Sequence, residues 1–164
     1  MSRAVLSIGS NLGDRAANLR VAVDGFTDVL VAVSSVYETA AWGVTDQPDF
    51  LNAVLIVDDD SVDEWGWLRR GHELENTAGR ARTRRWGPRT LDVDVVTVDG
   101  VRSDDPGLLL PHPGTHERAS VLVPWLDVDP HAEVPGRGMV ADLLSTLDVS
   151  GVRVHDLDLR GERA

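Results

Sequence analysis

The apolar positions up to Gly100 follow two different periods along the chain. Short apolar or alternating runs, rich in valine, isoleucine and leucine, predict strands, because such side chains suit a pleated, half-buried surface. These runs cover residues 4–8, 29–37, 50–57 and 92–98. Between them, apolar positions recur with the helical period, and they predict helices over residues 14–27 and 61–78.

Each predicted helix has a recognisable face or end. Leu19, Val23 and Phe26 fall on one face of the first helix. Ser61 and Glu64 have the spacing of a capping box at the start of the second helix, which Gly79 is suited to close. The resulting order, βαββαβ, is the split βαβ arrangement of ferredoxin-like α+β folds. We therefore expect a mostly antiparallel sheet with helices packed on it.

The pattern is weaker elsewhere. Residues 39–47 and 108–113 predict loops, the second of which approaches the candidate site described below. Residues 115–125 and 139–147 predict short helices. Residues 152–159 alternate, and they form either an edge strand or a frayed tail. With 164 residues, the chain is most simply a single domain.

The composition excludes several classes of protein. The chain has no cysteine, so neither a disulfide framework nor a thiolate zinc site is possible. Its N-terminal apolar run is too short for a signal peptide, and no stretch approaches the length of a membrane span. A net charge of −11 repels nucleic acid and anionic membranes at long range. We expect a soluble, cytoplasmic monomer without nucleic-acid or membrane partners.

An arginine cluster is the local exception to this acidic composition. All basic residues of the chain are arginines, and the absence of lysine excludes a P-loop. The members of the cluster are Arg80, Arg82, Arg84, Arg85 and Arg89. Such a cluster could be only an exposed arginine surface, but the residues that follow it favour a function.

Asp92 and Asp94 come directly after the cluster, in the predicted strand 92–98. Residues i and i+2 of a strand face the same side, so the two carboxylates project together while the valines face the opposite side. Two adjacent carboxylates repel each other unless a cation or a proton lies between them. Carboxylates that bind Mg²⁺ beside guanidiniums that bind phosphate are typical of a phosphoryl-transfer site.

Other polar residues near the predicted strand ends are ambiguous on their own. The motif Gly9-Ser-Asn-Leu-Gly13 lacks the spacing of a dinucleotide-binding loop, so a structural turn is favoured over a phosphate loop. Phe50 and Asn52 share a strand face, where a ring and an amide suit a flat heterocycle, although Asn52 alone could be an ordinary strand-end residue. His112 and Arg118 could contact phosphate, and His72 has no clear role.

Taken together, these motifs resemble one enzyme family. They are, in chain order, Gly9-Ser-Asn-Leu-Gly13, Tyr37-Glu-Thr39, Asp46-Gln-Pro-Asp-Phe-Leu-Asn52, Glu75 with Gly79-Arg-Ala-Arg82, Arg85-Trp-Gly-Pro-Arg-Thr-Leu-Asp-Val-Asp94, and Pro111-His112 with Arg118. The chain resembles the 6-hydroxymethyl-7,8-dihydropterin pyrophosphokinases of folate biosynthesis over about residues 4–126, and residues 127–164 form a C-terminal extension. The segment from Arg85 to Asp94 is the most specific part of the likeness.

The resemblance implies Mg²⁺-dependent transfer of pyrophosphate from ATP to the hydroxymethyl oxygen of the dihydropterin, with release of AMP. It assigns two Mg²⁺ ions to Asp92 and Asp94, and Asp92 could also receive the proton of the alcohol. It assigns contacts with ATP to Arg80, Arg82, Arg89, His112 and Arg118, with Arg80 and Arg82 on a loop that closes over the nucleotide and Trp86 closing with it.

The resemblance also implies a pterin pocket, in which Phe50 stacks on the ring. Its residues are Thr39, Ala40, Trp42, Phe50, Asn52, Glu75 and Asp92. The chain departs from the family pattern at Ser120, where a stacking phenylalanine is usual, at Ala40-Ala41, where Pro-Pro is frequent, and at Pro113. These departures concern the pterin pocket rather than the phosphate chemistry. The alternatives are a ferredoxin-like anion-binding module without turnover and a pyrophosphokinase with a different acceptor.

Overall fold

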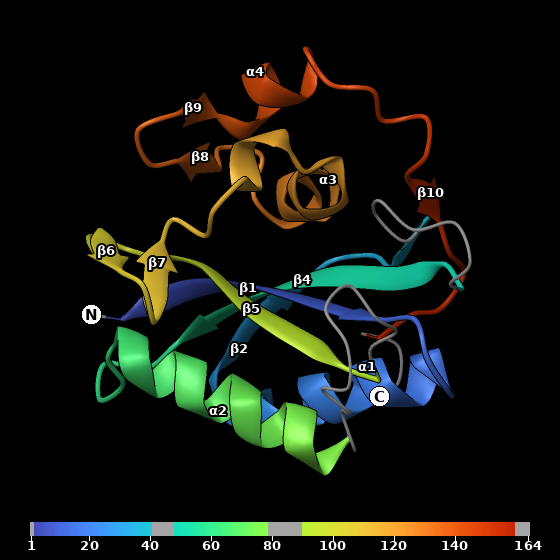
Figure 1. Ribbon diagram of the computed structural model, residues 1–164, viewed down its shortest axis with the longest axis horizontal. Helices are drawn as coiled ribbons and strands as arrows, with labels where there is room; N and C mark the ends of the chain where they lie inside the picture. Colours follow the sequence, from blue (N-terminus) through green and yellow to red (C-terminus); the bar gives the residue numbers. More distant parts are fainter. Residues whose placement is uncertain (1, 41–47, 79–89, 160–164) are drawn as a thin grey trace.

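The computed structural model describes residues 2–40, 48–78 and 90–159, which form a central sheet with helices on both faces (Figure 1). The strands follow the order β10-β3-β4-β1-β5, and β2 also pairs with β4. Their bounds are β1 Arg3–Ser10, β2 Leu30–Val33, β3 Tyr37–Thr39, β4 Phe50–Asp58, β5 Asp92–Val98 and β10 Arg153–Val154. Strand β1 lies between β4 and β5 and is antiparallel to both.

The helices form a layer on each side of the sheet. Helices α1 (Arg15–Gly25) and α2 (Glu64–Thr77) cover one face, below the sheet in Figure 1. Helices α3 (Ala119–Val128) and α4 (Val140–Leu144) cover the other face, together with the hairpin of β8 (Glu133–Val134) and β9 (Gly138–Met139). The order β5-β1-β4 followed by β2 and β3 is that of the ferredoxin-like sheet, so the predicted α+β fold is confirmed.

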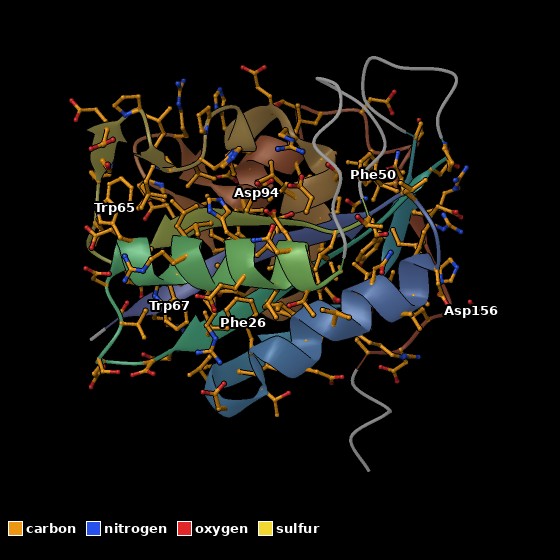
Figure 2. All side chains as sticks on the ribbon, turned by 60° about the horizontal axis from the view of Figure 1, so that its bottom comes forward. Phe26, Phe50, Trp65, Trp67, Asp94 and Asp156 are labelled. Carbon is orange, nitrogen blue, oxygen red and sulfur yellow. The ribbon has the colours of Figure 1, made fainter. Side chains whose placement is uncertain are left out.

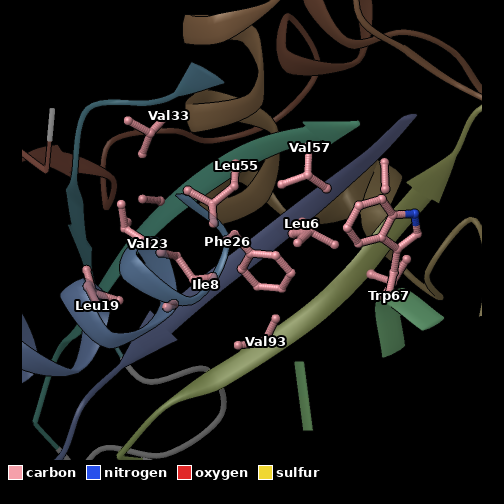
Figure 3. Close-up of a cluster of buried hydrophobic side chains, with 14 of the residues drawn as sticks. Leu6, Ile8, Leu19, Val23, Phe26, Val33, Leu55, Val57, Trp67 and Val93 are labelled. Carbon is pink, nitrogen blue, oxygen red and sulfur yellow. The ribbon is translucent and has the colours of Figure 1, made fainter. Parts of the chain in front are cut away.

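Alternation along the strands produces a hydrophobic core on each face. Leu6 and Ile8 of β1 belong to the cluster under α1 and α2, whereas Val5 belongs to the cluster under α3. In the first cluster, the rings of Phe26 and Trp67 lie with their centroids 6.4 Å apart (Figure 3). Because both faces of the sheet are covered, a site can open only at its edges or at the ends of its strands.

The predicted strand 29–37 is wrong as a single element. Residues Thr27–Val29 form a 3-10 turn, and β2 ends before Ser34. The Ser34 hydroxyl accepts a hydrogen bond from the backbone N–H of Val54 at 2.9 Å, while the Ser34 N–H donates to the Val54 carbonyl at 3.0 Å. Since a side chain replaces a backbone carbonyl as the acceptor, the regular ladder is interrupted here, and β3 begins only at Tyr37.

The predicted start of the second helix is also wrong. The carboxylate of Asp63 accepts the N–H of Gly66 at 2.8 Å and therefore caps α2. Ser61 instead donates its N–H and its hydroxyl to Asp59, at 2.9 and 2.7 Å. A competing local turn thus removes Ser61 from the helix.

The segments after Gly100 are partly as predicted. Residues 108–110, predicted as loop, form strand β7 (Leu108–Leu110) in a hairpin with β6 (Ser103–Asp105). The predicted helix 115–125 is a 3-10 turn, Thr115–Glu117, followed by α3, and the predicted helix 139–147 is the shorter α4. Of the two alternatives for residues 152–159, the edge strand is confirmed over Arg153–Val154, which pairs with β3. None of the helices in the described part of the chain has both the length and the apolar character that crossing a membrane requires.

Candidate active site

The sheet brings the candidate residues into two rows on the face covered by α3. Asn52 of β4, Gly9 of β1 and Asp92 of β5 are neighbours across the strands, and the next row contains Ser7 and Asp94. Neighbouring strands lie about 4.8 Å apart, so Asn52 and Asp92 are separated by about two such spacings. The amide and the two carboxylates therefore face one shared surface. Alternation along β5 predicts that the carboxylates project together, and the register of β4, β1 and β5 brings Asn52 to the same surface.

Gly9 determines the shape of this surface. A Cβ atom at Gly9 would lie 3.0 Å from Asn52 Oδ1 and 3.4 Å from Cδ1 of the Phe50 ring. The absence of a side chain at Gly9 thus leaves room for the Asn52 amide and the Phe50 ring to lie over β1. Figure 2 shows Phe50 near the start of β4 and Asp94 on β5.

The amide of Asn52 is oriented by strand β3. Asn52 Nδ2 donates to Thr39 Oγ1 at 2.7 Å, and Thr39 is itself buried. Thr39 pairs with Phe50 in the β3–β4 ladder, so Thr39, Phe50 and Asn52, three of the predicted pterin residues, belong to one corner of the sheet. Ala40 follows β3 and is exposed.

Asp94 lies in an environment that disfavours its charged form. Burial, with a contribution from the Asp92 carboxylate, raises the pKa of Asp94 to about 6, while His112 and Arg118 act in the opposite direction. His112 Nε2 lies 3.8 Å from Asp94 Oδ1. The structure therefore brings His112 and Arg118 to the carboxylate pair.

The outer edge of β5 is held by two residues of the site. Glu75 of α2, which is 1% exposed, accepts the backbone N–H of Val93 at 2.8 Å. The backbone N–H of His112 donates to the carbonyl of Val96, also at 2.8 Å. These bonds satisfy groups that an edge strand would otherwise leave unpaired, and they fix the strand that carries Asp92 and Asp94. Glu75 thus lies across β1 and β5 from Asn52.

A pocket of about 310 Å³ opens along this edge, between α2 and the β6–β7 hairpin. Its lining residues are Leu68, His72, Glu75, Asp92, Val93, Asp94, Val95, Pro106, Gly107, Leu108, Leu109, His112 and Pro113. Glu75, His72 and Leu68 follow one another at the spacing of one face of α2. The pocket therefore joins the carboxylate pair to an apolar wall of leucine side chains.

Some predicted residues lie outside the described part of the chain, and others were missed. Those outside it are Trp42, Arg80, Arg82, Trp86 and Arg89. Ser120 is half-buried in the first turn of α3. The sequence did not predict that Leu68 and Leu109 line the pocket. It also predicted a turn at Gly9, but of the two glycines in this motif Gly13, with φ of 73°, is the one in the turn conformation. The alternation of the small residues Ser7 and Gly9 with Leu6 and Ile8 was the available signal that Gly9 continues the strand.

Comparisons with known proteins agree with the resemblance in the sequence. The family model described as 7,8-dihydro-6-hydroxymethylpterin-pyrophosphokinase (HPPK) matches residues 5–130. A 2-amino-4-hydroxy-6-hydroxymethyldihydropteridine pyrophosphokinase of Mycobacterium tuberculosis is 48% identical, over 90% of this chain and 85% of the relative. The Mycobacterium leprae protein of the same name is 49% identical, over 100% of this chain and 94% of the relative.

Solved structures with this fold are more distant in sequence. The wild-type HPPK-DHPS of Plasmodium falciparum superposes with a TM-score of 0.66 at 14% identity. The match covers 88% of this chain and 44% of that one, so the chain spans less than half of that longer protein. This likeness supports the fold alone, whereas the family model and the mycobacterial relatives identify the family. The chain belongs to the 7,8-dihydro-6-hydroxymethylpterin-pyrophosphokinase family.

Proposed function

We propose that this protein transfers pyrophosphate from ATP to the hydroxymethyl group of 6-hydroxymethyl-7,8-dihydropterin, releasing AMP. The observation that carries the proposal is the shared surface in which Asn52 and Phe50 lie on one side of Gly9 and Asp92 lies on the other. A heterocycle held by the amide and the ring would place its hydroxymethyl arm toward the carboxylates. We also propose that the protein acts as a monomer in the cytoplasm.

Asp92 and Asp94 are the proposed ligands of two Mg²⁺ ions. The described residues contain no group of three or more acidic or histidine side chains arranged for a metal, so a fully protein-bound ion is not expected among them. Mg²⁺ at phosphoryl-transfer sites usually takes one or two carboxylates and completes its shell with phosphate oxygens and water. The raised pKa of Asp94 fits this role, because a cation would relieve the repulsion from Asp92. When bound, the metal would neutralise charge on the transferred group.

The nucleotide is proposed to occupy the pocket along the outer edge of β5. His112 and Arg118 lie beside Asp94, where they would contact the phosphates. Leu68 and Leu109 provide an apolar wall for a base, at the side of His72. The family motifs add Arg80, Arg82 and Arg89 to the phosphate contacts, and Trp86 to the residues that close over the nucleotide.

The pterin is proposed to lie on the other side of Gly9. Phe50 would stack on the ring, and the Asn52 amide, oriented by Thr39, would form hydrogen bonds with its edge. Ala40 and Trp42 complete the proposed pocket, and Glu75 is assigned to the wider active site. Asp92 faces the same surface and is the nearest candidate to accept the proton of the alcohol. Since the alcohol is an ordinary nucleophile, the rate would depend on in-line positioning and charge neutralisation.

One assay tests the reaction against its alternatives. The protein is incubated with ATP, Mg²⁺ and hydroxymethyldihydropterin, and AMP is measured with and without the pterin. Release of AMP that depends on the pterin is expected. An anion-binding module would bind ATP without turnover, and a pyrophosphokinase for another acceptor would form AMP only when that acceptor replaces the pterin.

A further inference from the structure

Three side chains from distant parts of the chain converge on Pro48 and Asp49, immediately before Phe50. Asn11 Nδ2 donates to the Pro48 carbonyl at 3.1 Å. Arg15 Nη1 donates to the Asp49 carbonyl at 2.9 Å, and Arg153 Nη2 donates to Asp49 Oδ2 at 2.9 Å. Asn11 lies in the connection after β1, Arg15 begins α1, and Arg153 lies on the C-terminal strand β10, so two distant parts of the chain hold the same two residues.

Glu38 of β3 joins the two arginines. Its Oε2 lies 2.7 Å from Arg15 Nη1, and its Oε1 lies 3.7 Å from Arg153 Nη2. The next residue of β3 is Thr39, whose hydroxyl accepts the Asn52 amide. The contacts therefore reach both strands that carry the proposed pterin residues, β3 on one side and the start of β4 on the other.

The composition of this cluster indicates that it does more than stabilise the fold. Arg15 is the first residue of α1, where the positive end of the helix dipole disfavours a cation. Asn11 is fully buried, and its amide donates to the main-chain carbonyl of Pro48, so the contact bears directly on the path of the main chain before β4. Exposed ion pairs such as that of Arg153 contribute little to stability. What these contacts do fix is the direction in which the main chain enters β4.

We infer that Asn11, Arg15 and Arg153 are positioning residues for the pterin, which hold Pro48 and Asp49 so that Phe50 and Asn52 face the ring. We call this set the Asp49 clamp. Side chains in a strand alternate, so a rotation of the chain at Asp49 would turn Phe50 and Asn52 together. The inference rests on the proposed roles of Phe50 and Asn52. It assigns a role to the Gly9–Gly13 motif and to the C-terminal strand.

The test compares Arg15→Gln and Arg153→Gln with Arg137→Gln, which changes an exposed arginine in the turn between β8 and β9. Michaelis constants for pterin and for ATP, kcat and melting temperature are measured for each variant. We expect the KM for pterin to rise about 5–20-fold in Arg15→Gln, the effect of losing hydrogen bonds from a charged donor. In Arg153→Gln we expect the KM for pterin to rise about 2–5-fold, the effect of losing an exposed ion pair. The KM for ATP and all constants of Arg137→Gln should stay within about twofold.

Two further variants make the result decisive. Asp49→Asn combined with Arg153→Gln should raise the KM for pterin no more than Arg153→Gln alone, because both changes remove the same contact. Asn52→Ala tests the proposed pterin site directly. Suppose that Asn52→Ala raises the KM for pterin. If Arg15→Gln then leaves the KM for pterin unchanged, or raises the KM for pterin and the KM for ATP equally, the clamp is overturned while the proposed site stands. If Asn52→Ala has no effect on the KM for pterin, the site assignment fails and the clamp fails with it.

Discussion

Asp94 combines an unfavourable position in the ligand-free protein with a central place in the proposed chemistry. Its pKa is raised from 3.8 to about 6, so the folded protein holds this proton more tightly than the unfolded chain does. The ionised Asp94 carboxylate therefore destabilises the folded protein. This destabilisation is absent below pH 3.8, develops as the pH rises from 3.8 to about 6, and is complete above about pH 6. A carboxylate whose charged form is disfavoured by burial and by a neighbouring carboxylate is typical of a functional site.

Asp94→Asn should therefore stabilise the ligand-free protein at neutral pH. We expect the free energy of unfolding to increase by about 1–2 kcal/mol at pH 7.5, less than the full pKa shift implies, because part of the side chain is in contact with water. The gain should vanish near pH 4, where the native carboxyl is protonated. Urea denaturation at both pH values measures it, with exposed Asp104→Asn as the control. Equal effects of the two substitutions would contradict the assignment.

Asp92→Asn and Asp94→Asn should both abolish turnover while leaving the fold intact. Each substitution keeps the size of the side chain but removes a negative charge, and Mg²⁺ accepts few substitutes for carboxylate oxygen. We expect the rate of AMP formation to fall by about two orders of magnitude or more, the scale of losing electrostatic stabilisation of a transition state. Near-normal AMP formation by either variant at saturating Mg²⁺ would refute the metal-ligand assignment.

Gly9→Ala should separate pterin recognition from folding. Alanine is compatible with a strand, so we expect the stability to change by no more than about 1 kcal/mol. The new Cβ would lie 3.0 Å from Asn52 Oδ1, so the amide must shift, and the KM for pterin should rise about tenfold, the cost of a lost or misplaced hydrogen bond. The matched control is Gly151→Ala, because a Cβ there meets no atom within 4 Å. A rise in the KM for ATP without a rise in the KM for pterin would contradict the role of Gly9.

At the scale of elements, the period of the hydrophobic positions was sufficient to locate a strand or helix where the local propensity of the segment agrees with its tertiary packing. Strands β1, β4 and β5 and helix α1 lie where the period predicts them, and α2 does so except for its start. The three strands bury residues in both core clusters, and each of the two helices buries one apolar face. The break at Ser34 was not predictable, since it depends on Val54, which is distant in sequence. The β6–β7 hairpin is local and turns at Pro106-Gly107, so residues 108–110 were misread as a loop although a turn signal was present. The carboxylate pair was predictable from alternation alone, whereas the position of Gly9 between Asn52 and Asp92 required the register of three strands.

Helix α3 provides a test of the family departure at Ser120. Its first turn carries Ser120 two residues after Arg118, where the family usually has a stacking phenylalanine. We expect Ser120→Phe to tighten pterin binding by about 0.5–1.5 kcal/mol, the contribution of an aromatic pair. Calorimetric titration of the pterin measures it. Unchanged or weaker affinity would mean that another group already covers this face of the pterin.

At the scale of the whole molecule, charge explains why the nucleotide should need a metal. The chain carries a net charge of −11, so ATP approaches a molecule of its own sign. Only a local excess of positive charge can reverse this repulsion. His112 and Arg118 lie beside two carboxylates, and the arginine cluster is nearby in sequence. Mg²⁺ would convert the carboxylates from a repulsive feature into ligands for the same phosphates.

The stability of the whole protein should therefore respond to Mg²⁺ and ATP together. A ligand that binds only the folded state raises its stability according to its concentration and affinity, by about 2.7 kcal/mol at a hundredfold excess over Kd. We expect a clear rise in melting temperature with Mg²⁺ and a non-hydrolysable ATP analogue at pH 7.5, and little rise when EDTA replaces Mg²⁺. The rise should shrink at pH 5, because Asp94, with a pKa of about 6, must lose its proton to bind a cation. Asp94→Asn is the control: because it lacks the titrating carboxyl, any pH dependence of the melting-temperature rise that remains in this variant belongs to the nucleotide. A shift that persists in EDTA, or that is as large in this variant as in the unaltered protein, would show that the nucleotide binds without a metal at Asp94.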